Sequence, residues 1–229
     1  MNLLNFLNIE NQSNLDIIKA ETIKVNLNKF LSHQIHRLGL FHWDKSFQWS
    51  GEFNQDGIKH IIEYVPLKGV SGTFQYGNSF NFIPSVNNKG KFIANHKRLQ
   101  LIERTKGWQE SLETSNTKTA YRVSHWNEYF FNKTLPLIFN SEKTQIEDWF
   151  NSNKDLEQNI QTALKQINSG GAYNLNSPSQ KVILAFLYAK NGEMKLAKNT
   201  LNDYYVPLIK LRDDFKIEYE EIEKSLNNV

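Results

Sequence analysis

The stretch between residues 41 and 86 constrains the fold more than any other part of the chain. It consists of short β-prone runs rich in aromatic residues, and turn sequences separate these runs. In residues 47–53, Phe, Trp, Gly and Phe stand at alternate positions, as on the buried face of a strand. Residues 54–57, Asn-Gln-Asp-Gly, are typical of a hairpin turn. We therefore expect an antiparallel β-meander, with the helical sequence on both sides of it as its cover.

Proline and glycine divide the meander into strands. Pro66 lacks an N–H and predicts the end or an edge of the second strand. The pair Gly77-Asn78 predicts a tight turn. Strands are expected at residues 47–53, 58–65, 73–76, 79–86 and 91–94, with one more around residues 99–102.

A long helix is expected before the meander. Apolar residues recur every three or four positions between residues 15 and 38, as on one buried helical face. Ser13 or Asn14 can cap its start, and Gly39 suits the left-handed position after its end. The pattern predicts a helix of about 24 residues, near 36 Å long, that packs on the sheet.

From Tyr121 onward the sequence predicts only helices. The first is expected to stop near Pro136, because proline disrupts a helix interior. Its expected buried stripe is Trp126, Phe130, Phe131 and Leu135. Later helices are expected at residues 143–150, 155–167, 177–190, 193–205 and 208–226.

These elements predict an α+β fold. A long N-terminal helix packs on an antiparallel meander of four to six strands, and a C-terminal helical bundle follows. We expect an α+β meander domain in residues 1–118 and a helical domain in residues 119–229, which can pack as one unit.

Residues 179–205 resemble a tetratricopeptide-type helical hairpin. Small Ala185 and Ala189 lie on the first expected helix, Gly192 at the turn and Ala197 on the second. No second copy follows at a spacing of about 34 residues. Since one copy cannot form a solenoid, we expect an isolated hairpin.

Composition excludes several classes of site. The chain of 229 residues has no cysteine, which excludes disulfides, a thiolate zinc site and a cysteine nucleophile. The net charge of +3, from 27 basic and 24 acidic side chains, is too balanced to indicate a dedicated nucleic-acid binder. The start of the sequence lacks the basic region of a signal peptide, and no apolar run reaches the roughly 18 residues of a membrane span. We expect a cytoplasmic protein without membrane association.

Three short motifs carry a family resemblance. These are residues 38–40 (Leu-Gly-Leu), 72–74 (Gly-Thr-Phe) and 80–84 (Phe-Asn-Phe-Ile-Pro), in the order helix, aromatic strand, hairpin, apolar strand. Residues 20–110 resemble a bacterial domain-of-unknown-function family, number 4304. The resemblance implies an α+β fold and no catalytic residues. Such domains look like the immunity proteins encoded beside bacterial toxins, which is an analogy at the level of fold.

Four aromatic residues of the meander are candidate binding residues. Tyrosine and tryptophan are favoured anchors of protein interfaces. On a sheet, however, such residues are more often part of the core. The four are Trp43, Trp49, Tyr64 and Tyr76, for which an exposed rim of the meander is the less common of the two places.

A basic stretch in residues 89–108 is the second candidate binding region. A basic loop with a stacking aromatic can bind single-stranded nucleic acid or another anionic partner. The alternative is a solvated strand edge, where lysines deter edge-to-edge pairing. The residues singled out are Lys97, Arg98, Arg104 and Trp108.

Neither histidines nor carboxylates form a known catalytic motif. His33 and His36 share a helix face and His42 follows, but no carboxylate has the spacing of a zinc hydrolase motif. A carboxylate group on the first hairpin more simply faces solvent, and it consists of Glu52, Asp56 and Glu63. We therefore expect no catalytic residues, no metal and no cofactor.

The leading hypothesis is a non-enzymatic protein-binding module of a bacterium, of the immunity or antitoxin type, that binds and neutralises a toxin. A second hypothesis is an enzyme with a cryptic site at the junction of sheet and helices, built on His96 or His125 with a carboxylate. A third is a nucleic-acid- or anion-binding module that uses residues 89–108. The sequence leaves the oligomeric state open.

Overall fold

A computed structural model describes most of the chain, and contacts divide it into two compact units. The first unit comprises Met1–Glu52, Ile61–Tyr76 and Glu103–Asp148, and the second comprises Phe53–His60, Gly77–Ile102 and Trp149–Val229. The expected domain boundary after residue 118 falls within residues 110–120, outside the described part, so the two expected domains remain a prediction. The described residues are 17–44, 47–67, 70–86, 92–93, 98–109, 121–169 and 178–229.

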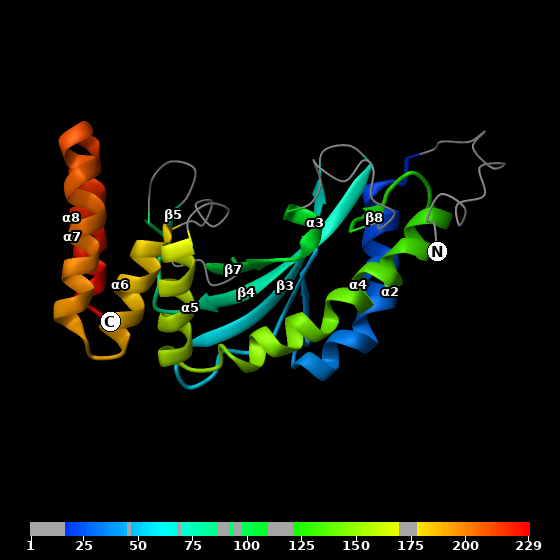
Figure 1. Cartoon of the computed structure of the whole chain (residues 1–229), viewed down its shortest axis with the longest axis horizontal. Coiled ribbons are helices and arrows are strands. Elements are labelled where there is room, and N and C mark those ends of the chain that lie inside the picture. The colour runs from blue at the N-terminus through cyan, green and yellow to red at the C-terminus, as the bar shows by residue number, and fades with distance from the viewer. Residues whose placement is uncertain are drawn as a thin grey trace. The chain divides into compact units, whose positions relative to one another are not determined.

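The strands form a curled antiparallel sheet, which confirms the predicted α+β class (Figure 1). In the main sheet the order is β1-β2-β3-β4-β7, and β8 also pairs with β4. A separate two-stranded sheet joins β5 and β6. The bounds are β1 (His42–Asp44), β2 (Gln48–Ser50), β3 (Ile58–Leu67), β4 (Ser71–Phe80), β5 (Ser85–Val86), β6 (Phe92–Ile93), β7 (Leu101–Arg104) and β8 (Val123–Ser124).

The expected turn at Gly77-Asn78 is wrong, because β4 runs through both residues. A Cβ atom on Gly77 would lie 1.9 Å from the carbonyl oxygen of Leu101, so glycine permits the close approach of β7. Asn78 is fully buried, and its Nδ2 donates hydrogen bonds to Asn153 O (2.9 Å) and Asn159 Oδ1 (2.7 Å). The expected fourth strand is replaced by the end of β4, a turn at residues 81–84 and the short β5.

The first expected strand is shorter than predicted and is preceded by β1. The β1–β2 register pairs Trp43 with Trp49, and β3 continues the meander by pairing Ile62 with Trp49. Phe47 adopts a left-handed conformation (φ 68°) directly before β2. Its carbonyl accepts a hydrogen bond from Tyr64 N (2.9 Å).

The N-terminal helix α2 (Ala20–Ile35) buries one face, as predicted. The expected caps Ser13 and Asn14 lie outside the described residues, and residues 17–19 precede the helix. The backbone N–H of Ile18 donates to the carbonyl of His125 (3.1 Å), so residue 18 is tied to a distant segment rather than to a helical turn. A 3₁₀ turn, η2 (His36–Leu38), follows, and Gly39 ends it with φ 72°.

Helix α4 (Glu128–Asn151) joins two helices that the sequence separates at Pro136. Proline within a helix costs about 3 kcal/mol, but burial of Leu135, Ile138 and Phe139 around it outweighs this cost. The ring of Phe139 packs edge-on against Phe30 of α2, at 5.9 Å between centroids. The expectation of helices alone after Tyr121 is also wrong, since β8 precedes α4. A single helical turn, α3 (Lys106–Gln109), also lies in the first unit.

The second unit contains four successive helices (Figure 1). Ser179 caps the helix after it, accepting from Val182 N (3.4 Å), so this helix begins two residues after Pro178 instead of at residue 177. The helix after it, α7, continues to Leu211 and includes Pro207, so it extends beyond the predicted end at residue 205. The four are α5 (Leu156–Ser169), α6 (Gln180–Lys190), α7 (Met194–Leu211) and α8 (Asp214–Leu226).

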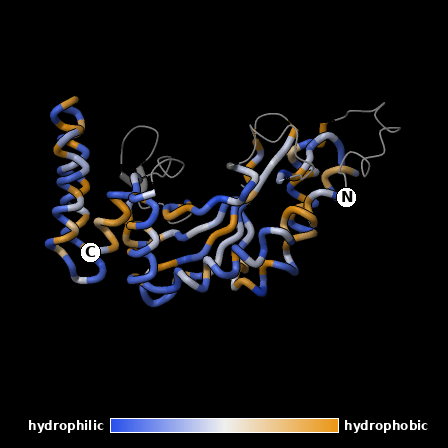
Figure 2. Tube along the Cα trace, viewed as in Figure 1, coloured by the Kyte–Doolittle hydropathy of each residue, from blue (hydrophilic) through white to orange (hydrophobic). Residues whose placement is uncertain are grey.

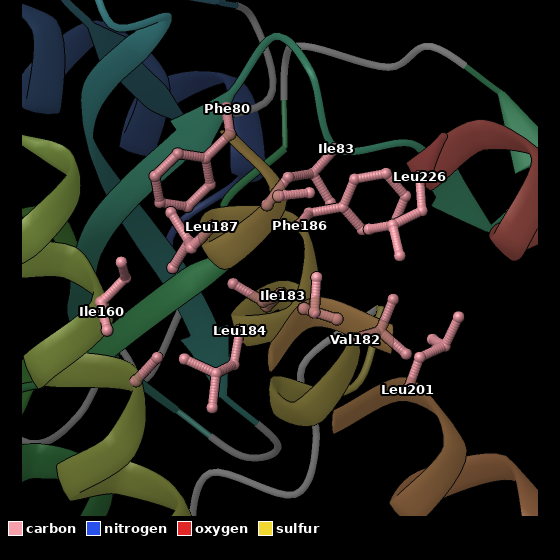
Figure 3. Packing of buried hydrophobic residues seen from close by; sticks show 14 of the residues in the cluster. Phe80, Ile83, Ile160, Val182, Ile183, Leu184, Phe186, Leu187, Leu201 and Leu226 are labelled. Atoms are coloured by element: carbon pink, nitrogen blue, oxygen red, sulfur yellow. The ribbon is translucent and has the colours of Figure 1, made fainter. Parts of the chain in front are cut away.

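Helix α6 is the centre of the second unit's core and is mostly hydrophobic along its length (Figure 2). Phe80 at the end of β4 and Ile83 in the turn after it point toward Phe186 and Leu187 of α6 (Figure 3). All four side chains are at most 1% exposed. Together they place the turn at residues 81–84 firmly against α6.

A side chain protects the edge of the sheet at β7. Gln166 of α5 donates from Nε2 to the carbonyl of Ile102 (2.8 Å), and Gln180 donates to Gln166 Oε1 (3.0 Å). An edge carbonyl satisfied in this way cannot pair with another strand. Within the part of the chain that the structure describes, none of the helices has the length and apolar character needed to cross a bilayer.

Candidate functional site

Three of the four candidate aromatic residues are buried. Trp49, Tyr64 and Tyr76 are 2%, 1% and 0% exposed, so these three belong to the core, the more common place for such residues on a sheet, and not to an exposed rim. Each points to the face of the sheet that the helices cover, where an aromatic ring buries a large apolar area. Trp43 is half-buried and stacks on Trp49 with ring centroids 4.4 Å apart.

The buried tyrosines have structural hydrogen bonds. The hydroxyl of Tyr76 accepts a bond from Gln145 Nε2 of α4 (3.0 Å). The hydroxyl of Tyr64 lies 2.5 Å from Nε2 of His125. Phe131 packs against both of these rings, so the pair is enclosed in the first unit's core.

Of the candidate residues in the basic stretch, the structure brings Arg104 and Trp108 into contact. Lys97 lies outside the described residues, and Arg98 is exposed in the second unit. In the first unit, the guanidinium of Arg104 stacks on the Trp108 ring at 4.6 Å from its centroid. Trp108 Nε1 also donates to Phe74 O (3.1 Å), which fixes the indole against β4. Its ring therefore has a structural partner on one face already.

The described histidines and carboxylates that the sequence singled out do not form one common site. His42 pairs with Glu52, and His36 packs against Phe41. Glu63 accepts a hydrogen bond from Gln75 (2.6 Å), and Asp56 lies in the turn after β2. His33 is exposed on α2, and His96 lies outside the described residues. No three potential metal ligands come together among the residues with described positions.

The first three turns of α4, together with Trp126 just before the helix, expose a row of large side chains that the sequence did not identify as a site. Trp126, Tyr129 and Leu137 are 40%, 64% and 51% exposed, and Phe130 and Lys133 lie between them. Within α4, spacings of three and four residues place Tyr129, Phe130, Lys133 and Leu137 on one face. Trp126 precedes the helix, and its ring contacts that of Phe130. We call these five residues, Trp126, Tyr129, Phe130, Lys133 and Leu137, the aromatic stripe.

The rings of the aromatic stripe are held in place by their neighbours. Asn127 caps the helix, because its Oδ1 accepts from Phe130 N (2.9 Å). Phe130 makes edge-on contacts with Trp126 (centroids 6.4 Å apart) and with Tyr129 (5.4 Å). Lys133 Nζ lies 5.3 Å from the Tyr129 ring centre and 3.2 Å from its hydroxyl. A surface with such restrained rings loses little side-chain entropy on binding.

The opposite face of α4 carries the core, so this part of the helix is apolar on two faces. Phe131 and Leu135 are buried, whereas Trp126 is exposed, so the single buried stripe that the sequence predicts is divided between core and surface. Further along α4 the outward positions Asn140 and Thr144 are polar, as is normal for a surface helix. One sequence signal could have revealed the aromatic stripe. Residues 126–137 contain more large apolar side chains than the buried face of one helix can hold.

Titratable groups near the stripe are not arranged for proton transfer to a ligand. Burial lowers the pKa of His125 to about 4, and its ring faces Tyr64 in the core. Glu128, beside the stripe, accepts a hydrogen bond from Asn26 of α2 (2.9 Å). The stripe thus offers aromatic surface and one cation, which are means of recognition.

Comparisons with protein-family models, with curated proteins and with solved structures found no match to this chain. The resemblance of residues 20–110 to the family of unknown function therefore stays a prediction.

Proposed function

We propose that the protein is a non-enzymatic binding module that recognises another protein through the aromatic stripe. The observation that carries the proposal is the exposure of Tyr129 and Leu137 on one face of α4, and of Trp126 just before it, although the other face of the helix is already buried. Contiguous exposed apolar surface is costly in water and commonly marks an interface. Tryptophan and tyrosine are also the residues most enriched among the energetically dominant positions of interfaces.

The partner that fits best is a bacterial toxin, with this chain acting as its immunity protein or antitoxin in the cytoplasm. The support is the resemblance described above and the nearly balanced charge, which disfavours a polyanionic partner. A module that neutralises a toxin needs only a complementary surface. That requirement matches a row of rings held in place by their neighbours.

The two alternative functions have weaker support. An enzyme built on His125 would need the imidazole to reach a substrate, but its side chain is bonded to Tyr64 and is 5% exposed. A nucleic-acid module would need free stacking surface at Trp108, and Arg104 covers one face of that ring. We therefore keep one proposal.

The test is to co-express the chain with the product of the adjacent gene and to measure binding of the purified pair by calorimetry. We expect a dissociation constant below about 1 μM for the wild type. Replacing Trp126 and Tyr129 together by serine removes two anchors, so the affinity should fall at least about 30-fold.

The matched control is Leu211→Ser, since Leu211 is 78% exposed on α7 and lies outside the stripe. This control should bind as the wild type does. A complex whose affinity is unchanged by the double substitution would refute the stripe as the interface. Absence of any protein partner at micromolar affinity would refute the function itself.

A further inference from the structure

The second unit contains a pocket that none of the residues of the aromatic stripe lines. Its volume is about 330 Å³, and it forms where the turn after β4 meets the ends of α6 and α8. This volume lies at the lower end of the range for small-molecule sites. The lining residues are Asn81, Phe82, Ile83, Pro84, Lys190, Ser225, Asn228 and Val229.

The apolar wall of the pocket is preformed. Ile83 is 1% exposed, and its carbonyl accepts a hydrogen bond from Gln100 Nε2 (2.8 Å). Asn81 N donates to Gly57 O (3.0 Å), and Phe82 packs against Phe80 with centroids 5.6 Å apart. Figure 3 shows Ile83 between β4 and α6, near Leu226 of α8. A wall that is held in this way requires little reorganisation when a ligand binds.

Most polar groups around the pocket already have partners within the helices. Ser225 Oγ donates to Glu221 O, and Asn228 Nδ2 donates to Lys224 O, both at 3.0 Å. At the end of α6, Asn191 N and Gly192 N donate to preceding carbonyls at 3.0 Å. The negative ends of both helix dipoles are thereby partly satisfied.

Lys190 is the charged side chain that lines the pocket. Its ammonium lies 5.5 Å from the centre of the Phe82 ring, so the cation is held at the apolar wall. Among the residues with described positions, no carboxylate forms an ion pair with Lys190. The pocket therefore combines an aromatic wall with one available positive charge.

We propose that this pocket binds a small organic anion with a flat apolar body. The body packs against Phe82, Ile83 and Pro84, and the carboxylate or other anionic group pairs with Lys190. Two interactions contribute to the affinity: the charge-assisted hydrogen bond between Lys190 and the anionic group, and the burial of the ligand's apolar body. The alternative role of Lys190 is structural: a lysine at the C-terminal end of a helix complements the helix dipole, and this role requires no ligand.

Three probes with the same ring and different charge separate these two roles. Benzoate, neutral benzamide and cationic benzamidine are titrated into the full chain, and amide chemical shifts are followed by NMR. We expect benzoate to bind with a dissociation constant on the order of 1 mM. Benzamide should bind about tenfold more weakly and benzamidine not measurably, with shifts centred on residues 81–84, 190 and 225–229.

Variants assign the charge preference to Lys190. Lys190→Gln should make benzoate and benzamide bind equally, whereas Lys195→Gln, an exposed lysine on α7 that does not line the pocket, should keep the tenfold preference. Phe82→Leu should weaken benzoate and benzamide by similar factors. Equal binding of all three probes to the wild type, shifts elsewhere, or no binding of benzoate at 20-fold this concentration (about 20 mM) would overturn the proposal. Because the aromatic stripe is not involved, these outcomes are independent of the proposed protein partner.

Discussion

The hydroxyl of Tyr64 and Nε2 of His125 lie 2.5 Å apart inside the first unit. Burial raises the pKa of the Tyr64 hydroxyl well above its usual range and lowers the pKa of His125 to about 4, so both groups are neutral at pH 7. Tyr64 therefore donates the hydrogen bond, and the imidazole carries its proton on Nδ1. A Cβ atom on Gly72 would lie 2.1 Å from the tyrosine oxygen, so a glycine in β4 makes room for the pair.

The main chain of His125 also joins separate segments of the first unit. Its N–H donates to Val70 O (2.7 Å), and its carbonyl accepts from Ile18 N (3.1 Å). The backbone of His125 thus links the residue before β4 with the residues before α2. Trp126, the first residue of the aromatic stripe, follows directly. The position of the stripe therefore depends on this pair.

Removal of the Tyr64 hydroxyl should destabilise the protein. In Tyr64→Phe the buried Nε2 of His125 loses its hydrogen-bond donor, which costs about 1–3 kcal/mol of unfolding free energy. Urea denaturation monitored by circular dichroism measures this loss. Tyr129→Phe is the control, since Tyr129 is 64% exposed and its change should stay below about 0.5 kcal/mol. Equal effects of the two substitutions would contradict the structural role of the pair.

Stability should fall when the pH drops from about 6.5 to about 4. The pKa of His125 is near 6.5 when the chain is unfolded and about 4 when it is folded, so in this window only the unfolded state takes up a proton. The linkage favours unfolding by up to about 3 kcal/mol at the acidic end. Burial also lowers the pKa of His60, which acts in the same direction.

Unfolding free energies measured at several pH values test this dependence. The variant His125→Asn loses the titrating group, so its stability should vary less between pH 6.5 and pH 4 than that of the wild type. The comparison concerns the slope and remains valid if the variant is less stable at every pH. A slope identical to that of the wild type would show that His125 does not cause the acid sensitivity.

Gly77→Ala should be more damaging than an alanine substitution at another glycine of unusual conformation. The new Cβ would lie 1.9 Å from the Leu101 carbonyl oxygen, so β7 has to move away from β4. We expect a loss of more than about 2 kcal/mol. In Gly39→Ala the backbone is left-handed (φ 72°) but nothing lies within 4 Å, so only about 1 kcal/mol should be lost. Thermal unfolding of both variants measures the difference, and a larger loss at Gly39 would contradict the close approach.

Pro136→Ala should stabilise the protein. Alanine restores a backbone N–H in the middle of α4 and removes the clash of the proline ring with the preceding turn. We expect an increase of about 1–3 kcal/mol, part of which is offset by the greater entropy of the unfolded chain. The melting temperature measures it. A lower melting temperature would mean that the proline ring contributes packing that outweighs its helix penalty.

Local patterns predicted much of the fold. The turn before Ile58 is confirmed, with Gly57 at a positive φ of 76°. Helices α5 and α8 lie within about a residue or two of their expected bounds at their C-terminal ends, because their apolar spacing is regular. The order of helix, antiparallel sheet and helices is confirmed as well.

Patterns failed where a residue acts through a distant neighbour. Gly77-Asn78 is a typical turn sequence, yet the glycine admits β7 and the asparagine bonds to Asn153 and Asn159. Pro136 normally ends a helix, but the buried residues around it keep α4 intact. In each case tertiary contacts made after chain collapse outweigh a local preference of a few kcal/mol.

The sequence by itself determined the fold class, because the periodicity of apolar residues and the residues of turns are local properties. It also determined which aromatic residues are present. Only the tertiary structure decided which aromatic rings face water. Trp49, Tyr64 and Tyr76 enter the core, whereas Trp126 and Tyr129 remain outside. The physical reason is that a sheet and a helix each have a limited buried face, and the packing of distant segments determines which side chains fill it.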